Sequence, residues 1–240
     1  MSSAAPQIGF DRFIQLDLAA AALRVRAGVS DIAQLTELID ATHAGAAAKK
    51  KTRTVLNRLW VEPRPDLADF ADRGVRIYRD SPGTPISVLT WGMAITTYPF
   101  FGKVAEIVGR LTALQGDCAS AEVHRRMAEI YGEREGTRRM TNMVLQSQAS
   151  WGAIDRTLNG KRLVRKPKTQ VNEPKLIAWL VEACVRYSGR PLSITTLDSY
   201  PSVFPFQMKE PLSYVLSSSG TVELRTDGIS NQVVDVKSRG

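Results

Sequence analysis

The sequence predicts a mainly helical protein, in which an N-terminal helical bundle precedes a winged-helix-like C-terminal part with short β-hairpins. Three observations support this fold class. Apolar residues recur at helical spacing through the first half of the chain. Asn159-Gly160, a dipeptide typical of hairpin turns, follows the end of a helical segment. Hydrophobic residues make up 43% of the chain and charged residues 23%, a composition that builds a sizeable core without disulfides.

The N-terminal part is expected to consist of consecutive helices. Gly28 ends the first helix, and Ser30 is expected to cap the second, which carries Ile32, Leu35 and Ile39 at helical spacing. The expected helices cover residues 12–27, 46–61, 66–78, 86–97 and 104–114, together with the one that follows Ser30 and one that begins at Ser120.

The segment from Ser81 to Gly102 contains no charged residue and could be mistaken for a membrane span. Pro82, Pro85 and Pro99 interrupt it, and the apolar part between residues 86 and 95 is too short to cross a bilayer. We therefore expect a buried core helix here.

The pattern changes in the second half of the chain. A helix is expected at residues 137–150, and a basic hairpin follows at 156–168, which is the order of a winged helix's last helix and wing. A similar pattern then recurs, with helices at 174–187 and 211–218 and strands at 221–225 and 232–236, joined through Asp227-Gly228. We expect a helical bundle at 1–132 and a winged-helix-like domain at 133–240, which alternatively divides into two small units at 133–170 and 171–240.

The charge balance favours an anionic partner. Lys and Arg number 32 against 24 Asp and Glu, which gives a formal net charge of +8 and suits either nucleic acid or an acidic membrane face. The two cysteines, Cys118 and Cys184, exclude a disulfide framework and a four-cysteine zinc site, and two histidines leave little for metal chemistry. With no secretory signal pattern, we expect a cytoplasmic protein without a cofactor.

The helix at 137–150 carries the most informative face. At 100° per residue, Met140 and Val144 fall on one side, and Arg139, Asn142 and Gln146 fall on the other, with Arg138 beside them. Arginine matches the edge of guanine and Asn or Gln matches that of adenine, so this face suits a DNA groove. A solvated polar face remains an equal alternative.

Two basic clusters are candidates for contact with phosphates, and a solvated surface is the alternative for both. The first follows the candidate helix in the basic hairpin. The second begins at the start of a helix, where the helix dipole favours acids rather than lysines. Their members are Arg156, Lys161, Arg162, Arg165, Lys166 and Lys168 in the hairpin, and Lys49, Lys50, Lys51, Arg53 and Arg58 in the helix.

Enzyme motifs are mostly missing from the sequence, which contains no phosphate-binding glycine loop, dinucleotide fingerprint or nucleophile elbow. One alternative is a Mg²⁺-dependent nuclease, because Asp227, Asp235 and Lys237 resemble the D…(D/E)-x-K pattern. Asp227 is explained as well by the turn that it forms with Gly228. Another alternative is a protein-interaction scaffold that docks partners through residues 98–101 and the C-terminal hairpin.

The order of elements resembles the BrxA-type accessory proteins of bacterial BREX phage-defence systems. The features that carry the resemblance are the basic segment 49–59, the Tyr98-Pro99-Phe100-Phe101-Gly102 break and Thr137-Arg138-Arg139, within residues 12 to 155. The resemblance implies a helical bundle with a winged-helix-like portion that binds double-stranded DNA and has no catalytic activity. A transcriptional regulator of the winged-helix type is a variant of this interpretation. We expect duplex DNA and other defence-system proteins as partners, and neither a membrane nor a small-molecule substrate.

Overall fold

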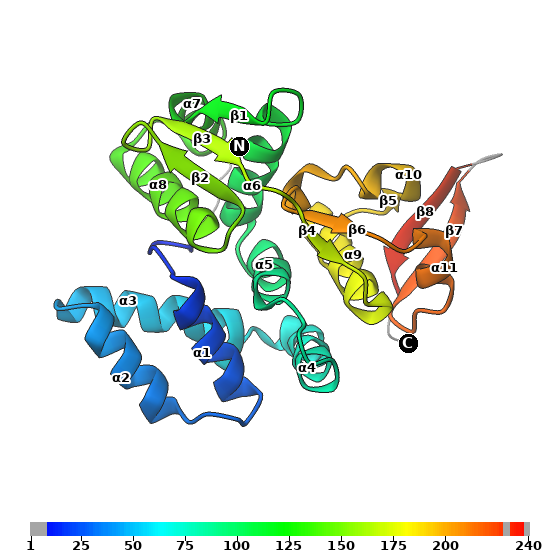
Figure 1. Ribbon diagram of the computed structural model, residues 1–240, viewed down its shortest axis with the longest axis horizontal. Coiled ribbons are helices and arrows are strands. Elements are labelled where there is room, and N and C mark those ends of the chain that lie inside the picture. Colours follow the sequence, from blue (N-terminus) through cyan, green and yellow to red (C-terminus); the bar gives the residue numbers. More distant parts are fainter. Residues whose placement is uncertain (1–8, 228–230, 238–240) are drawn as a thin grey trace, which may run out of the picture.

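The computed structural model describes residues 9–227 and 231–237, and it is mainly helical, as the sequence predicts (Figure 1). Helices α1 to α3 lie together at the lower left of Figure 1, and α4 and α5 connect them to the rest of the chain. The bounds are α1 Leu16–Arg26, α2 Ile32–Thr42, α3 Ala46–Leu56 with a π-helical turn at Asn57–Val61, α4 Pro65–Asp80 and α5 Ile86–Thr97.

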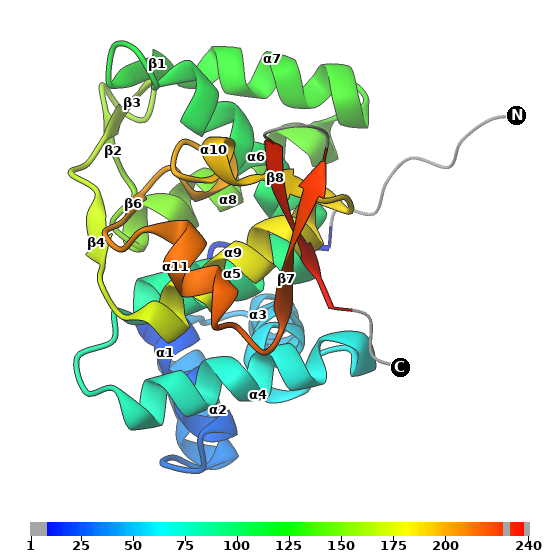
Figure 2. The same ribbon diagram turned by 90° about the vertical axis from the view of Figure 1, so that its right-hand side faces the viewer.

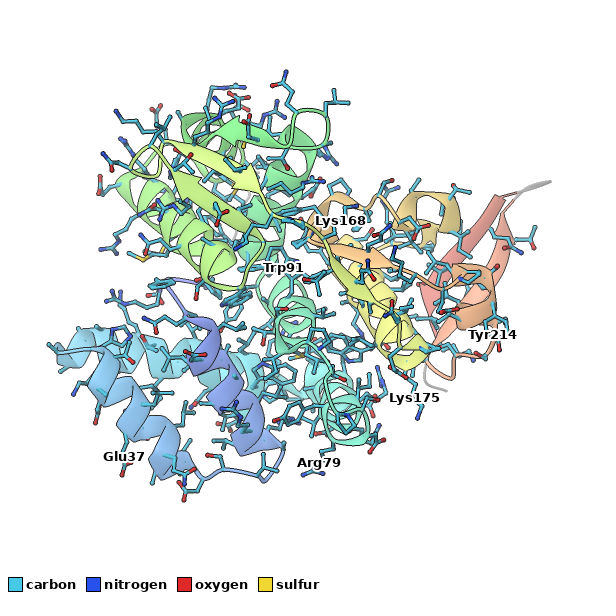
Figure 3. The ribbon with its side chains drawn as sticks, in the orientation of Figure 1. Glu37, Arg79, Trp91, Lys168, Lys175 and Tyr214 are labelled. Carbon is cyan, nitrogen blue, oxygen red and sulfur yellow. The ribbon has the colours of Figure 1, made fainter. Side chains whose placement is uncertain are left out.

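Helix α5 is the centre of the core, which confirms the prediction of a buried helix in the uncharged segment. Every residue from Val88 to Thr97 is buried. The ring of Trp91, labelled near the middle of Figure 3, packs edge-on against Phe101 at 5.1 Å, Phe204 at 5.6 Å and Phe206 at 5.7 Å between ring centroids. None of the helices formed by the described residues combines the length and the apolar character that crossing a bilayer requires.

Residues 99–165 form a helix-and-strand unit, here called the first unit. Its elements are α6 Pro99–Leu111, β1 Asp117–Ala119, α7 Ser120–Tyr131, α8 Glu135–Ser150, β2 Ile154–Thr157 and β3 Arg162–Arg165. The three strands make an antiparallel sheet in the order β1-β3-β2. The hairpin of β2 and β3 therefore follows directly after the long helix α8.

Residues 174–236 repeat this order, with a 3-10 turn and one further strand inserted before the last helix, and are called the second unit. They contain α9 Pro174–Ser188, β5 Leu192–Ser193, α10 Ile194–Leu197, a 3-10 turn at Pro201–Val203, β6 Phe206–Met208, α11 Leu212–Ser217, β7 Val222–Asp227 and β8 Asn231–Val236. Its main sheet has the order β5-β8-β7, which matches β1-β3-β2 position by position. Strand β6 instead pairs in parallel with β4, Thr169–Val171, which links the two units.

The structure differs from the sequence-based expectations at several boundaries. Strand β1 lies before residue 132 and its partner β3 lies after it, so the expected division at 132 would separate two paired strands. Asp31, rather than Ser30, caps α2, because its side chain accepts a hydrogen bond from the amide of Gln34. Helix α6 begins at Pro99 instead of residue 104, since proline fits the first turn of a helix. Gly228, in the expected C-terminal turn, lies outside the described residues.

Candidate nucleic-acid interface

Helices α7 and α8 and the β2–β3 hairpin enclose a hollow of about 1300 Å³ on the surface of the first unit. All three elements contribute polar or charged side chains to its lining. These include His124 and Arg125 from α7, Arg138, Arg139 and Asn142 from α8, and Arg156 and Lys161 from the hairpin.

Helix α8 is oriented as its sequence pattern predicts. Met140 and Val144 are buried, and so they fix the apolar face of the helix against the core. Arg138 and Arg139 are exposed on the other side, whereas Asn142 and Gln146 are only half-buried. The two arginines therefore project furthest from the helix, and the two amides lie closer to the protein.

The hairpin is held against both helices. Leu158, Asn159 and Gly160 have φ of 50°, 55° and 80°, so the turn uses left-handed backbone at three consecutive positions. At the tip, the amide and hydroxyl of Ser120 donate to the carbonyl of Lys161 at 2.9 and 3.2 Å. Arg156 donates through Nη2 to Oδ1 of Asn142 at 2.7 Å, which connects the hairpin to α8.

The pKa values of two groups that line the hollow, Arg156 and His124, and of Glu122 beside it on α7, respond to burial and to charged neighbours. Burial lowers the pKa of Arg156. Burial is also the main cause of the lowered pKa of His124, followed by the positive charges of Arg138 and Arg156. The pKa of Glu122 falls to about 2, because Arg125 and Arg126 donate hydrogen bonds to its carboxylate.

Some of the cations near the hollow are neutralised and others are not. Arg125 forms ion pairs with Glu122 and Glu129 along α7. By contrast, Arg138, Arg139 and Lys161 form no ion pair among the residues that the structure describes. Glu133 and Glu135 also line the hollow, at the end where α7 meets α8. Among the described residues that line the hollow, the cations without an ion pair therefore include those of α8 and of the hairpin tip.

Three further hairpin cations from the sequence prediction have partners within the protein. Arg162 is bound by both carboxylate oxygens of Asp117, at 2.7 to 2.9 Å, and Lys166 lies 3.6 Å from Asp155. Arg165 is held more firmly, because it donates to the hydroxyl of Thr112 at 3.0 Å and to the carbonyl of Gly109 at 2.7 Å.

Arg165 joins the two units instead of facing solvent. Its guanidinium lies over the ring of Phe204 in the second unit, 5.1 Å from the centroid, and burial lowers its pKa. We therefore leave Arg165 out of the candidate phosphate contacts. Lys168, three residues after the end of β3, is exposed.

The second basic cluster lies on α3 and the turn after it. Lys49 and Lys51 form ion pairs with Asp40 at 3.2 Å and with Asp11 at 3.1 Å. Arg53 is half-buried, and Lys50 and Arg58 are exposed. Helices α3 and α8 both lie on the side of the molecule away from the β7–β8 hairpin, with α3 below α8 (Figure 1), and both recede behind the second unit in Figure 2.

The residues of the nuclease alternative do not converge along the C-terminal hairpin. In the register of β7 and β8, Asp235 is opposite Glu223, whereas Asp227 is opposite Asn231. Four residues of strand separate these positions, which is about 13 Å. The side chain of Asp235 lies 3.8 Å from Arg225, and Lys237 donates to the carbonyl of Ser219 at 2.9 Å. Within the described ranges, no group of three or more His, Cys, Asp or Glu side chains is placed to hold a metal ion.

Sequence reasoning missed the contribution of α7 to the hollow. His124 and Arg125 belong to a helix that was expected to serve only as part of the bundle. The helical periodicity of α7 gave part of this information. Val123 and Met127 define its buried face, and His124 and Arg125 lie outside that face.

A search of protein-family models, of curated proteins and of solved structures found no match to this chain.

Proposed function

We propose that the first unit is a winged helix and that the protein binds double-stranded DNA through it, without catalysis. The order helix, strand, helix, helix, hairpin and the sheet order β1-β3-β2 support the assignment of α8 as the last helix and of β2–β3 as the wing. The observation that carries the proposal concerns Arg138 and Arg139. Both are exposed and form no ion pair among the described residues, and they lie on a helix that borders a hollow beside the wing.

In the proposed complex, α8 enters the major groove with its N-terminal half, as recognition helices do. Arg138 and Arg139 contact base edges or the phosphates beside them, because a guanidinium serves either role. Asn142 already accepts a hydrogen bond from Arg156, so it positions the wing and reads a base only if that bond opens. Lys161, at the tip of the wing, contacts phosphate, and Lys168 extends the basic surface.

The exposed cations of α3 and of the turn after it provide a second, weaker contact. Lys50 and Arg58 are free to meet phosphates, while Lys49 and Lys51 would first leave Asp40 and Asp11. A role in phage defence is part of this proposal only through the resemblance to BrxA-type proteins. Regulation of transcription is a variant of the same activity, and a footprint at the protein's own promoter would favour it.

The test measures the affinity of the full chain for a fluorescent duplex as a function of salt concentration. We expect Arg138→Glu combined with Arg139→Glu to weaken binding by roughly tenfold or more and to reduce the salt slope by about two. Arg24→Glu combined with Arg190→Glu is the matched control, because both residues are exposed and lie outside the first unit. No duplex binding by the wild-type protein at low salt, or equal losses in the two double variants, would overturn the proposal.

A further inference from the structure

A second cavity lies away from the first unit, where α4, the start of α9 and the 218–221 loop between α11 and β7 meet. Its volume is about 410 Å³, which falls within the roughly 300–1,000 Å³ typical of small-molecule sites. Lys175, in the first turn of α9, is labelled on this side of the molecule in Figure 3, next to α4.

The mouth of the cavity is positively charged. Arg76 and Lys175 line it, both are exposed, and neither forms an ion pair within the described part of the chain. Asp80 also lines the cavity, one helical turn after Arg76. Ser218 and Thr221 contribute hydroxyl groups from the loop. Two unpaired cations beside hydroxyl groups are a surface that attracts a phosphate.

A buried carboxylate lines the inner part of the cavity. Glu182 has 0% exposure, and its Oε1 accepts hydrogen bonds from Arg73 at 2.5 Å and from Arg186 at 2.8 Å. Its Oε2 has no hydrogen-bond partner among the described residues. A buried hydrogen-bond acceptor without a donor is energetically unfavourable. A ligand in the cavity could supply the missing N–H or O–H donor to this oxygen.

The remaining walls are apolar. Ile77, Ala178 and Val215 are buried and face the cavity from α4, α9 and α11. Trp179 also lines it, but its ring is stacked on Phe70 with centroids 4.3 Å apart, so it offers an edge rather than a free face. A compact ring system therefore fits against aliphatic side chains between the cationic mouth and Glu182.

We propose that this cavity binds a phosphorylated small molecule with the size of a nucleoside monophosphate. The phosphate meets Arg76 and Lys175 at the mouth, and an N–H group of the base donates to Oε2 of Glu182. The sequence led us to expect no small-molecule substrate; here the molecule is a ligand, and no reaction is assigned to it. Because the cavity joins α4 to the second unit, the bound ligand stabilises the contact between them.

The experiment uses the full chain and four probes: AMP, adenosine, ribose 5-phosphate and inorganic phosphate, each titrated by calorimetry and by thermal unfolding. We expect AMP to bind more tightly than each of the other three compounds. At a concentration about 100-fold above its Kd, AMP should raise the melting temperature by roughly 5 °C or more. Arg76→Glu and Lys175→Glu should each weaken AMP binding by roughly tenfold, whereas Lys209→Glu, an exposed position of the second unit outside the cavity, should not.

Glu182→Gln tests the inner contact, because it preserves the volume of the side chain. We expect its AMP affinity to fall to that of ribose 5-phosphate, with circular dichroism to show that the variant folds. If Glu182→Gln does not fold, Arg76→Glu and Lys175→Glu still test whether AMP binds in this cavity. No binding of AMP below about 1 mM, equal affinity for AMP and inorganic phosphate, or unchanged affinity in both mouth variants would overturn the proposal. The Arg138→Glu, Arg139→Glu protein should keep its AMP affinity, so failure of this site and failure of DNA binding are distinguishable.

Discussion

The first and second units share an order of helices and strands but present different surfaces. Helix α8 spans 16 residues and exposes Arg138 and Arg139, whereas α11 spans 6 residues and exposes Ser213 and Tyr214, the latter at 70%. The charges of the second hairpin are also used internally, because Arg225 pairs with Glu223 and lies 3.8 Å from Asp235. The same topology therefore supplies a cationic surface in one unit and a nearly neutral one in the other.

A shared arrangement of strands and helices therefore does not determine which partner each unit binds. Helices α8 and α11 lie at opposite ends of the molecule in Figure 1, and in Figure 2 α11 faces the viewer while α8 lies behind it. A single straight duplex against α8 would therefore not reach α11. The proposed DNA binding therefore belongs to the first unit, whereas the second unit contributes most of the walls of the proposed ligand cavity.

The largest expected effect concerns the core that the two units share. Trp91→Ala removes a ring that contacts Phe101 and Phe204, which belong to different units, and it should lower the free energy of unfolding by about 3–5 kcal/mol. Urea unfolding of the wild-type protein, followed by circular dichroism and fluorescence, should show one transition, because both units depend on this ring. Two resolved transitions would mean that the units are independent.

The next prediction contrasts the two hairpins. Lys161→Glu combined with Lys166→Glu should weaken duplex binding by roughly tenfold and reduce its salt dependence, since Lys161 lies at the tip of the first hairpin and Lys166 directly follows its second strand. Arg225→Glu combined with Lys237→Glu makes the same charge change in the second hairpin and should alter affinity by less than about twofold. Fluorescence anisotropy at two salt concentrations measures both. An equal loss in the two proteins would remove the distinction between the hairpins.

The sequence pattern predicted the long elements well, because helical periodicity depends on neighbours along the chain. Helix α5 has the expected bounds, and α8 differs by two residues at its start. Strands β1 and β4 were not expected, since each has three residues and forms only by pairing with a strand distant in sequence. Short strands of this kind carry too little local pattern to be recognised.

The sequence predicted which face of α8 is exposed, but it did not predict which basic residues of the hairpin find partners within the protein. The exposed face of α8 follows from the position of Met140 and Val144 along the helix. The burial of Arg165 against Phe204 could not be foreseen, because a cation in a basic run gives no sign of which neighbour will neutralise or cover it. The pairing of Arg162 with Asp117 depends in the same way on β1, which was missed.

A smaller effect is expected from two glycines, one associated with each unit. Gly160 has φ of 80° in the first hairpin turn, so Gly160→Ala should destabilise the protein by about 1 kcal/mol and lower the melting temperature by about 2–4 °C. A side chain at Gly220, just before β7, would meet nothing within 4 Å, and Gly220→Ala should leave stability unchanged or raise it slightly. Calorimetric melting of the two variants tests the contrast, and equal melting temperatures would contradict it.

The smallest expected effect is a dependence of binding on pH that comes from His124, which is the histidine of the first unit; the other histidine, His43, lies in the N-terminal helices. The pKa of His124 is lowered by burial, then by Arg138 and Arg156, and its Nδ1 has no hydrogen-bond partner among the described residues. In the free protein, a lowered folded-state pKa means that the contribution of His124 to stability is present above pH 6.5 and is lost as the pH falls through the folded-state value.

Phosphates bound near Arg138 would offset that positive charge and raise the pKa of His124 in the complex, so protonation and duplex binding should favour each other. Affinity should therefore increase as the pH falls from 7.5 to 5.5, by about threefold more in the wild-type protein than in His124→Gln, which requires the complex to raise the pKa of His124 by at least about half a unit. Anisotropy titrations at the two pH values measure this ratio. The same increase in both proteins would show that His124 does not sense the bound phosphates and would place the duplex further from α7 than the hollow requires.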